Sequence, residues 1–339
     1  MSCGLWPLPL KMEKKMAIET LWKLSTTSGP DRGRGEWTDG QRPWAPAVDA
    51  RSRDRQINHY DYLAQIARAA ELTGFDGLFI PDEADGEEPW IVTGALLRET
   101  RYLKLVTAVA PGSASAVYQG KMAASAQRFS GGRQAWFLDL DSDAAARRKT
   151  GDFALEEDLA PRARELVTLV NGIWGEGPYD QDGQHFVVEK GGLGGLVAHV
   201  ERPELWIGGN APGVDALSAE HADVHLLDAL SIESARAEIG RLRASTGARQ
   251  RRFGVQLSIL AREEQADVDA ELRRAPRPTG EIAGSYDAVA QALAEYADAG
   301  IDVLLLNAPD QIREVHIVGE QVLPRLHKLL SNTSARAAA

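Results

Sequence analysis

Two aspartates alternate along one short apolar segment of the chain. Asp139 and Asp141 lie in the stretch "WFLDLDSD", directly after apolar residues. Because successive side chains of a strand point to opposite faces, both carboxylates are expected on the same face. Aspartate is disfavoured inside strands, so the pair indicates a site in which a carboxylate acts as a base, a ligand or a polar pocket group. Such a pair would repel an anionic substrate and suit a cation or a polyol.

A glycine turn marks a second candidate site. In "ELWIGGNAPGV" an apolar run ends at Gly208 and Gly209, and a helical pattern follows. Asn210 is predicted to cap this helix, with Pro212 in its first turn. Free backbone N–H groups and the helix dipole converge at such a terminus and favour an anion. An ordinary strand-to-helix turn has the same pattern, so the residues alone leave both interpretations open.

Strand and helix patterns alternate along the whole chain. We predict eight strands, each followed by helix, at 18–26, 75–81, 103–111, 133–141, 204–209, 223–229, 253–261 and 301–309. Repeated strand–helix units imply a parallel sheet, and eight of them suit the α/β class, as a (β/α)8 TIM barrel. An open doubly wound sheet is the alternative, but no GxGxxG fingerprint follows the first strand. A hairpin is predicted at 179–192, inserted after the fourth helix.

The expected domain organisation is a single barrel over residues 17–331. A disordered extension would precede it at 1–16, and a disordered tail would follow at 332–339. The first residues are not a secretion signal, because their short apolar part precedes the basic residues. No apolar run reaches the roughly 18 residues that a membrane helix needs.

Composition limits the partners. The 339 residues carry a net charge of −11, which argues against nucleic acid and anionic membranes as partners. Cys3 is the only cysteine, so no intrachain disulfide is expected, and a cytoplasmic location fits. The histidines show no metal-ligand spacing, and we predict no metal site.

In a barrel of this kind the site lies at the carboxyl ends of the strands. Trp22 and Lys23 end the first strand, where they would wall a substrate pocket and bind an anion. A packed aromatic and a solvated lysine are the alternatives. His225, on the sixth strand, would line the same mouth or be a hydrogen-bonded core histidine.

Three stretches carry a family resemblance: "DYLAQIARAAELTGFDGLFIP", "LKLVTAVAPGSASAVYQGKMAASAQRFSGGR" and "YADAGIDVLLLNAPDQIREVHIVGEQVLPRL". They resemble the bacterial-luciferase-like flavin monooxygenases, with the alkanesulfonate monooxygenases as the nearest group. The resemblance implies a TIM barrel that binds reduced FMN supplied by a separate NAD(P)H:flavin reductase. It also implies addition of O₂ to the flavin, oxygenation of a small organic substrate, and a homodimer, with a heterodimer as the alternative.

The resemblance also suggests where the cofactor would lie. It places the FMN phosphate at the turn after the fifth strand. The residues assigned to the cofactor are Thr107, Ser142, Gly208, Gly209, Asn210 and Ala211.

Several positions depart from the alkanesulfonate pattern. Gly86, assigned here to the substrate pocket, stands where that group has a cysteine, and Ala110 stands where it has an arginine. Gln256 and Ser258 replace an arginine and a histidine on the seventh strand, and they hydrogen-bond without titrating near neutrality. A sulfonate substrate is therefore not expected. The residues assigned to catalysis are Asp139, Asp141, Gln256 and Ser258.

Three alternatives remain open at this stage. The barrel could have lost catalysis and serve as a flavin-binding or partner subunit. It could use the deazaflavin F420, although no basic groove for its acidic tail is evident. It could also have abandoned flavin for a reaction that uses Asp139 and Asp141.

Overall fold

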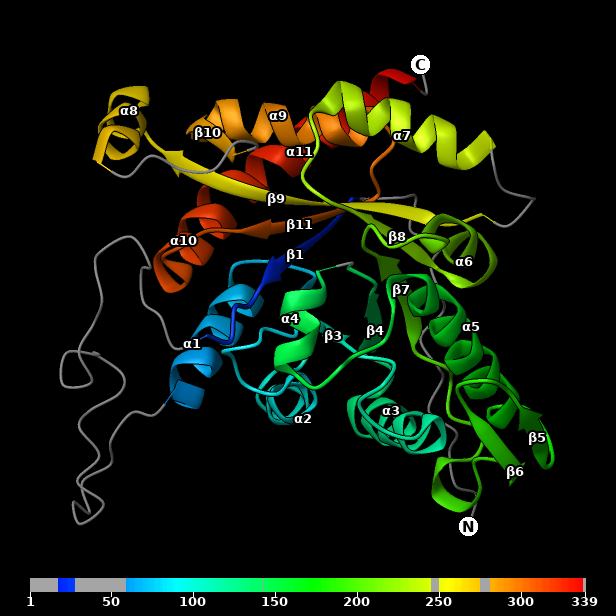
Figure 1. Ribbon diagram of the computed structural model, residues 1–339. Coiled ribbons are helices and arrows are strands. Elements are labelled where there is room, and N and C mark those ends of the chain that lie inside the picture. The colour runs from blue at the N-terminus through cyan, green and yellow to red at the C-terminus, as the bar shows by residue number, and fades with distance from the viewer. Residues whose placement is uncertain (1–17, 28–58, 142, 245–249, 275–280, 338–339) are drawn as a thin grey trace, which may run out of the picture.

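The computed structural model describes residues 18–27, 59–141, 143–244, 250–274 and 281–337. Eight parallel strands close into a barrel in the order β1-β2-β3-β4-β7-β8-β9-β11, and β11 pairs again with β1 (Figure 1). The predicted TIM barrel is therefore confirmed. The barrel strands are β1 (Glu19–Lys23), β2 (Gly77–Ile80), β3 (Lys104–Ala108), β4 (Gln134–Asp139), β7 (Glu204–Gly208), β8 (Val224–Leu227), β9 (Arg252–Arg262) and β11 (Val303–Asn307).

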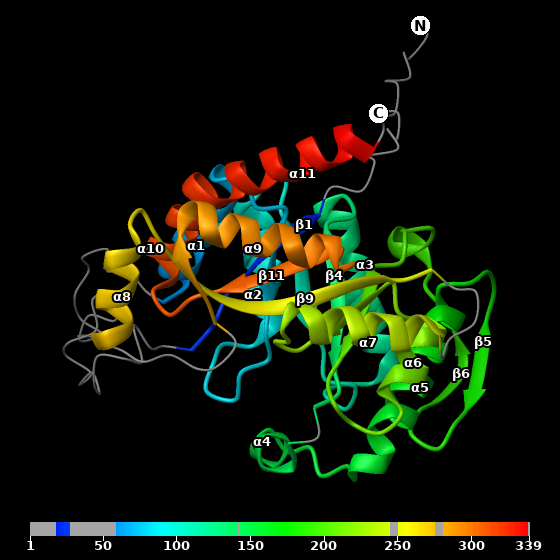
Figure 2. The same ribbon diagram turned by 90° about the horizontal axis from the view of Figure 1, so that it is seen from above.

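Helices surround the barrel strands (Figure 2). They form where apolar residues recur at helical spacing, as Leu63, Ile66, Ala67 and Ala70 do in α1. The helices are α1 (His59–Leu72), α2 (Pro89–Glu99), α3 (Ala116–Ser130), α4 (Ala144–Lys149), α5 (Glu156–Ile173), α6 (Val214–His221), α7 (Ile232–Ala244), α8 (Gln265–Arg274), α9 (Tyr286–Asp298), α10 (Gln311–Ile317) and α11 (Leu323–Ala337). No described helix is long and apolar enough to cross a membrane.

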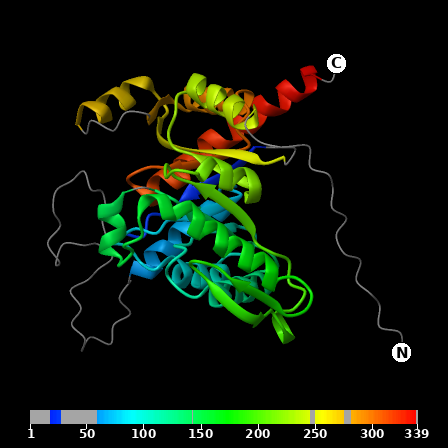
Figure 3. The same ribbon diagram turned by 45° about the vertical axis from the view of Figure 1, so that its right-hand side comes forward.

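Two elements extend the barrel. The predicted hairpin is present as β5 (Tyr179–Asp182) and β6 (Val187–Gly191), which pair antiparallel beside α5 (Figures 1 and 3). A ninth strand, β10 (Glu281–Ser285), pairs with the far end of β9. The sequence prediction missed β10, because its five residues were assigned to a helical region.

The last helical segment is longer than predicted. One π-helical turn, Val318–Val322, joins α10 to α11. Helix α11 then continues to Ala337, past the expected boundary at 331. The expected extension at 1–16 lies outside the described residues.

The barrel interior is filled in layers. Alternate strands contribute each layer, as is usual for this fold. The middle is apolar, with Leu21, Val106 and Trp206 below Phe79 and Phe137. A TIM barrel filled in this way is a packed core with no pore, so ligands approach it from the loops.

A ring of four charged side chains closes the amino-terminal end of the barrel. Lys104 Nζ lies 2.6 Å from Glu19 Oε1 and 2.8 Å from Glu204 Oε2. Arg252 pairs with the same two carboxylates. The four residues come from alternate strands, so this charged ring is the lowest layer of the barrel.

Candidate functional site

A small cavity of about 90 Å³ opens at the carboxyl ends of the strands. We call this cavity the mouth. The strands β1, β2, β3, β4, β7, β8 and β9 all contribute to it, directly or through the residues that follow them. Its lining residues are Lys23, Phe79, Pro81, Asp82, Ala108, Phe137, Asp139, Asp141, Gly209, Asn210, Leu226, Leu227, Asp228 and Gln256.

The mouth has an apolar floor and a polar wall. Phe79 and Phe137 meet edge-to-face at 5.0 Å between ring centroids and form most of the floor. Ala108 and Gly208 end two of the walls with little or no side chain. A Cβ added to Gly208 would lie 2.8 Å from the Leu226 carbonyl oxygen and 3.0 Å from the Phe137 ring, so only glycine fits beside this floor. The Phe137 ring therefore packs close to the end of β7, and the small side chain of Ala108 lines the mouth on the other side of β4.

The two predicted aspartates both line the mouth. Asp139 ends β4, and its side chain is open to the solvent of the mouth while the barrel wall surrounds its other sides. The wall keeps bulk water from the Asp139 carboxyl and, with the negative charges of Asp141 and Asp228, raises its pKa to about 6. The Asp141 carboxylate accepts the Asp143 amide at 3.0 Å. Asp139 is therefore the titrating group of the mouth near neutral pH.

Sequence reasoning missed Asp228. It follows β8 and lines the mouth together with Leu226, two residues earlier. The same alternation that singled out Asp139 and Asp141 would have found it, because Leu226 faces the barrel interior. Asp82, which follows β2, is the fourth carboxylate of the mouth.

Lys23 and Gln256 face each other across the mouth. The Lys23 ammonium donates to the Gln256 Oε1 at 3.5 Å, a long hydrogen bond. Ser258 lies one step further along β9, where its hydroxyl donates to Asn307 Oδ1 at 2.9 Å. Gln256 lines the mouth directly, while Ser258 is tied to the neighbouring strand β11.

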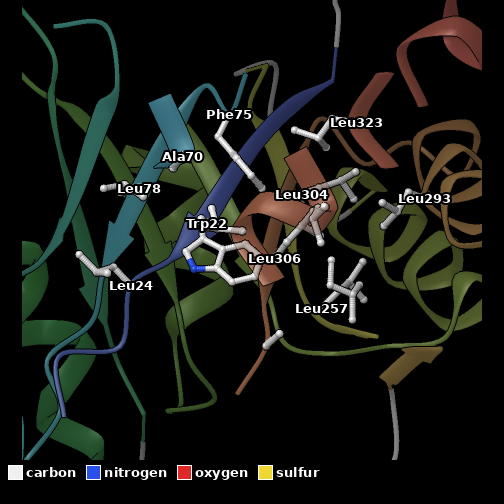
Figure 4. Close-up of a cluster of buried hydrophobic side chains, with 14 of the residues drawn as sticks. Trp22, Leu24, Ala70, Phe75, Leu78, Leu257, Leu293, Leu304, Leu306 and Leu323 are labelled. Atoms are coloured by element: carbon white, nitrogen blue, oxygen red, sulfur yellow. The ribbon is translucent and has the colours of Figure 1, made fainter. Parts of the chain in front are cut away.

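Trp22, assigned to the substrate pocket, and Thr107, assigned to the cofactor, both point away from the mouth. Trp22 is fully buried between the barrel and its helices, among Leu24, Leu78 and Leu306 (Figure 4). The Thr107 hydroxyl hydrogen-bonds to that of Thr93 on α2 at 2.8 Å. These two assignments are wrong, because strand alternation turns Trp22 and Thr107 outward while Lys23 and Ala108 turn inward.

His225 also faces outward. Its Nδ1 lies 2.7 Å from the Ser218 hydroxyl on α6. Burial, with the charge of Arg251 as a smaller cause, lowers its pKa to about 4. His225 is therefore a neutral core histidine, and the assignment to the substrate pocket is wrong.

Gly86 and Ser142 do not add to the mouth either. A Cβ added to Gly86 would lie 2.3 Å from Thr26 Oγ1, so Gly86 packs under the chain that follows β1. It does not line the mouth, and we withdraw it as a pocket residue. Ser142 lies outside the described residues.

The glycine turn after β7 differs from its prediction. Gly209 has a φ of 106°, and a Cβ there would lie 2.4 Å from the Leu140 carbonyl carbon. The Ala211 amide donates to the Leu140 carbonyl at 3.0 Å. Helix α6 starts only at Val214, with Gly213 at the N-cap position, so Asn210 does not cap it. One of the amides predicted to bind an anion is thus already used within the protein.

A wider cleft of about 570 Å³ adjoins the mouth and shares Asp82 and Ala108 with it. The start of α2, the loop after β3 and the loop before α5 form its walls. Arg162 crosses one wall and pairs with Asp152, with Nη1 and Oδ1 3.0 Å apart. Mouth and cleft together make one continuous site on one face of the barrel.

The profile of the family described as "Luciferase-like monooxygenase" matches residues 41–300. The chain belongs to the luciferase-like monooxygenase family. The match covers the barrel strands from β2 to β9 and the residues of the mouth from Phe79 to Gln256, whereas β1 and β11 lie outside it.

Several solved structures share this luciferase-like fold at low sequence identity. A riboflavin lyase, solved with modified FMN and riboflavin, is 16% identical with a TM-score of 0.73, over 92% of this chain and 91% of that one. The EDTA monooxygenase of Chelativorans sp. BNC1 is 16% identical with a TM-score of 0.72, over 92% and 94%. The coenzyme F420-dependent tetrahydromethanopterin reductase of Methanopyrus kandleri is 16% identical with a TM-score of 0.67, over 79% and 96%.

The mouth of this luciferase-like barrel fits one part of a flavin better than the other. The apolar floor of Phe79 and Phe137, with the small side chain of Ala108 beside it, suits a flat ring system. The turn at Gly209–Ala211 suits a phosphate less well, because the Ala211 amide is occupied and Asp141 lies beside it. A flavin ring can therefore be held by this mouth, whereas its phosphate finds few donors at the predicted place.

Proposed function

We propose that the protein is a flavin-dependent monooxygenase of the two-component kind. It would take FMNH₂ from a separate NAD(P)H:flavin reductase and oxygenate a small organic substrate. The family membership carries this proposal, and the apolar floor of Phe79 and Phe137 at the mouth supports it. When bound, reduced flavin supplies the electrons for O₂ activation, by which one oxygen atom reaches the substrate and the other leaves as water.

The residues of the mouth have separate parts in this proposal. Ala108 leaves room for the ring, and Phe79 and Phe137 form an apolar floor that excludes water from below. The Asp139 carboxyl, with its pKa raised to about 6, exchanges a proton with the substrate near neutral pH. Gln256 and Lys23 offer hydrogen-bond donors on the opposite side.

A sulfonate is a poor substrate for this site. Arginine is the side chain that best matches a sulfonate, and no described arginine lines the mouth. Four carboxylates do line it, and they would repel a negative substrate. The proposed substrate is therefore not anionic, in contrast to a sulfonate.

One observation favours a second candidate, a barrel that no longer binds flavin. The Ala211 amide donates to Leu140, which removes a donor from the expected phosphate site. In that case Asp139 would act as an acid or base without a cofactor. Coenzyme F420 is a weaker alternative, because its acidic tail would meet the carboxylates of the mouth.

Anaerobic titration with FMNH₂ and, separately, with reduced riboflavin tests the proposal. We expect saturable binding of FMNH₂ at micromolar affinity, about −8 kcal/mol. Reduced riboflavin should bind within about threefold of FMNH₂, because few charge-assisted hydrogen bonds await the phosphate. Absorbance or calorimetry would measure both.

Two variants sharpen this titration. Ala108→Leu places a larger side chain in the mouth and should abolish binding of both flavins, whereas Gly94→Ala on the exposed face of α2 should leave binding unchanged. Thermal melting verifies that each variant is folded. If the wild-type protein binds neither flavin, the monooxygenase proposal is wrong and the second candidate takes its place.

A further inference from the structure

We infer that the mouth selects a substrate with a positive charge, an organic ammonium or a similar cation, and that Asp228 is a specificity-determining residue for it. This inference rests on the proposed function, since it names the substrate class of the same site. It follows from the balance of charge, the shape of the floor and the position of Asp228.

Among the described residues of the mouth, carboxylates outnumber cations. Asp82, Asp139, Asp141 and Asp228 line the cavity, and Lys23 is the one described lysine or arginine that lines it. The Lys23 ammonium is directed to the uncharged Gln256 amide. In the part of the chain that the structure describes, none of the four carboxylates forms an ion pair with lysine or arginine. A ligand that brings a positive charge would supply the missing partner.

The shape of the mouth favours an organic cation over a metal ion. Among the described residues, no three histidine, cysteine or carboxylate side chains come together as a metal-binding group. The floor is made of Phe79 and Phe137, whose ring faces attract cations and whose surfaces accept hydrocarbon. An alkyl or aryl ammonium matches both the aromatic floor and the acidic wall.

The Asp228 carboxylate is exposed at the mouth. It makes no hydrogen bond to another described residue, whereas Asp141 accepts the Asp143 amide. In the barrel, β4 and β8 flank β7, so Asp139 and Asp228 lie on either side of the end of β7. That end is Gly208 and Gly209, so neither residue places a side chain between the two carboxylates.

A cation at this place would change the proton affinity of Asp139. The charged groups around Asp139 are Lys23 from β1, Asp82 after β2, Asp141 after β4 and Asp228 after β8. The negative neighbours help to keep the pKa of Asp139 high, and a bound ammonium would lower it again. Cation binding should therefore release protons and tighten as the pH rises from 5 to 7.

Three probes of equal size and different charge test the inference: cyclohexylammonium, cyclohexanol and cyclohexanecarboxylate. NMR titration of the full-length protein without flavin measures the Kd of each. We expect the ammonium to bind roughly tenfold more tightly than the alcohol, because a nearby carboxylate attracts it in a partly desolvated cavity. The carboxylate probe should not bind.

The variant Asp228→Asn keeps the size of the side chain and removes its charge. This substitution should raise the Kd of cyclohexylammonium about five- to tenfold and leave the Kd of cyclohexanol unchanged. Asp298→Asn removes one charge from the exposed end of α9, at the amino-terminal side of the barrel, and should change neither Kd. Added salt should weaken the binding of the ammonium probe only.

Three outcomes would overturn the inference. The first is equal binding of the three probes, and the second is a preference for the carboxylate probe. The third is equal weakening of ammonium and alcohol in Asp228→Asn, which would show that Asp228 only supports the structure. The probes need no flavin, so ammonium selectivity without flavin binding would refute the proposed function and support the charge inference. Flavin binding without ammonium selectivity would support the proposed function and refute the charge inference.

Discussion

Strand alternation decides which single side chains reach the mouth. Lys23 and Asp139 face inward, so their neighbours Trp22 and Leu138 face the helices. The sequence showed that Asp139 and Asp141 share a face, and the structure places both at the mouth. The sequence did not show which face of the first strand is the inner one. Trp22 and Lys23 are adjacent and point to opposite faces, so only one of them could line the pocket. The place of Asp228 at the mouth likewise depends on which face of β8 is the inner one.

The raised pKa of Asp139 has a consequence for stability. Its folded-state pKa is about 6, above the ordinary 3.8, so the folded protein binds this proton more tightly than the unfolded chain. The resulting stabilisation is complete below about pH 4 and is lost as the pH rises through 6. Asp139→Asn should therefore melt at a similar temperature to the wild type at pH 4 and at a higher temperature at pH 7.

Melting curves from pH 4 to 7 measure this difference. In an Asp228→Asn background the window should move to lower pH, because one charge that raises the pKa of Asp139 is gone. A difference that does not change with pH would contradict the assignment of Asp139 as the titrating group.

At the scale of elements, the order of strands and helices was predictable and several ends were not. Eight apolar runs separated by helical patterns are enough to specify the barrel, and the hairpin at β5 and β6 follows from its turn residues. The start of α6 was misplaced, because Gly213 adopts a φ of 87° and takes the N-cap position. Tertiary contact with Leu140 fixes this turn, and such a contact leaves no trace in the local sequence.

Gly209 is the residue on which this turn depends. Alanine there would need a positive φ and would place its Cβ 2.4 Å from the Leu140 carbonyl carbon. We expect Gly209→Ala to lower the free energy of unfolding by about 2–4 kcal/mol. Gly94→Ala, in α2 with no atom within 4 Å of the added Cβ, should instead raise it by about 0.5–1 kcal/mol. Chemical denaturation measures both, and equal effects of the two substitutions would refute the strain at Gly209.

At the scale of the whole molecule, the charged ring joins strands that are far apart in the sequence. Glu19, Lys104, Glu204 and Arg252 connect β1, β3, β7 and β9 below the apolar layers. Partial burial alone would raise the pKa of Glu204, but Lys104 and Arg252 hold it below its ordinary value. Its contribution to stability is therefore present above the ordinary pKa and is lost as the pH falls.

Removing the Glu204 carboxylate should reveal how much it contributes to the free energy of unfolding. Glu204→Gln leaves Lys104 and Arg252 short of a partner, and the pairs are partly exposed, so we expect a loss of about 1–3 kcal/mol at pH 7. The loss should shrink toward pH 3, where Glu204 is protonated in the wild type as well. Glu263→Gln, an exposed carboxylate after β9, is the control. A loss that is as large at pH 3 as at pH 7 would show that packing, and not charge, is responsible.

The charged ring and the packed layers above it also limit how a ligand can reach the mouth. They fill the barrel interior, so no tunnel runs through the barrel from end to end. Whatever enters at the mouth has to leave by the same face, through the mouth or the adjoining cleft. In the proposed reaction, substrate and product would therefore share this one opening.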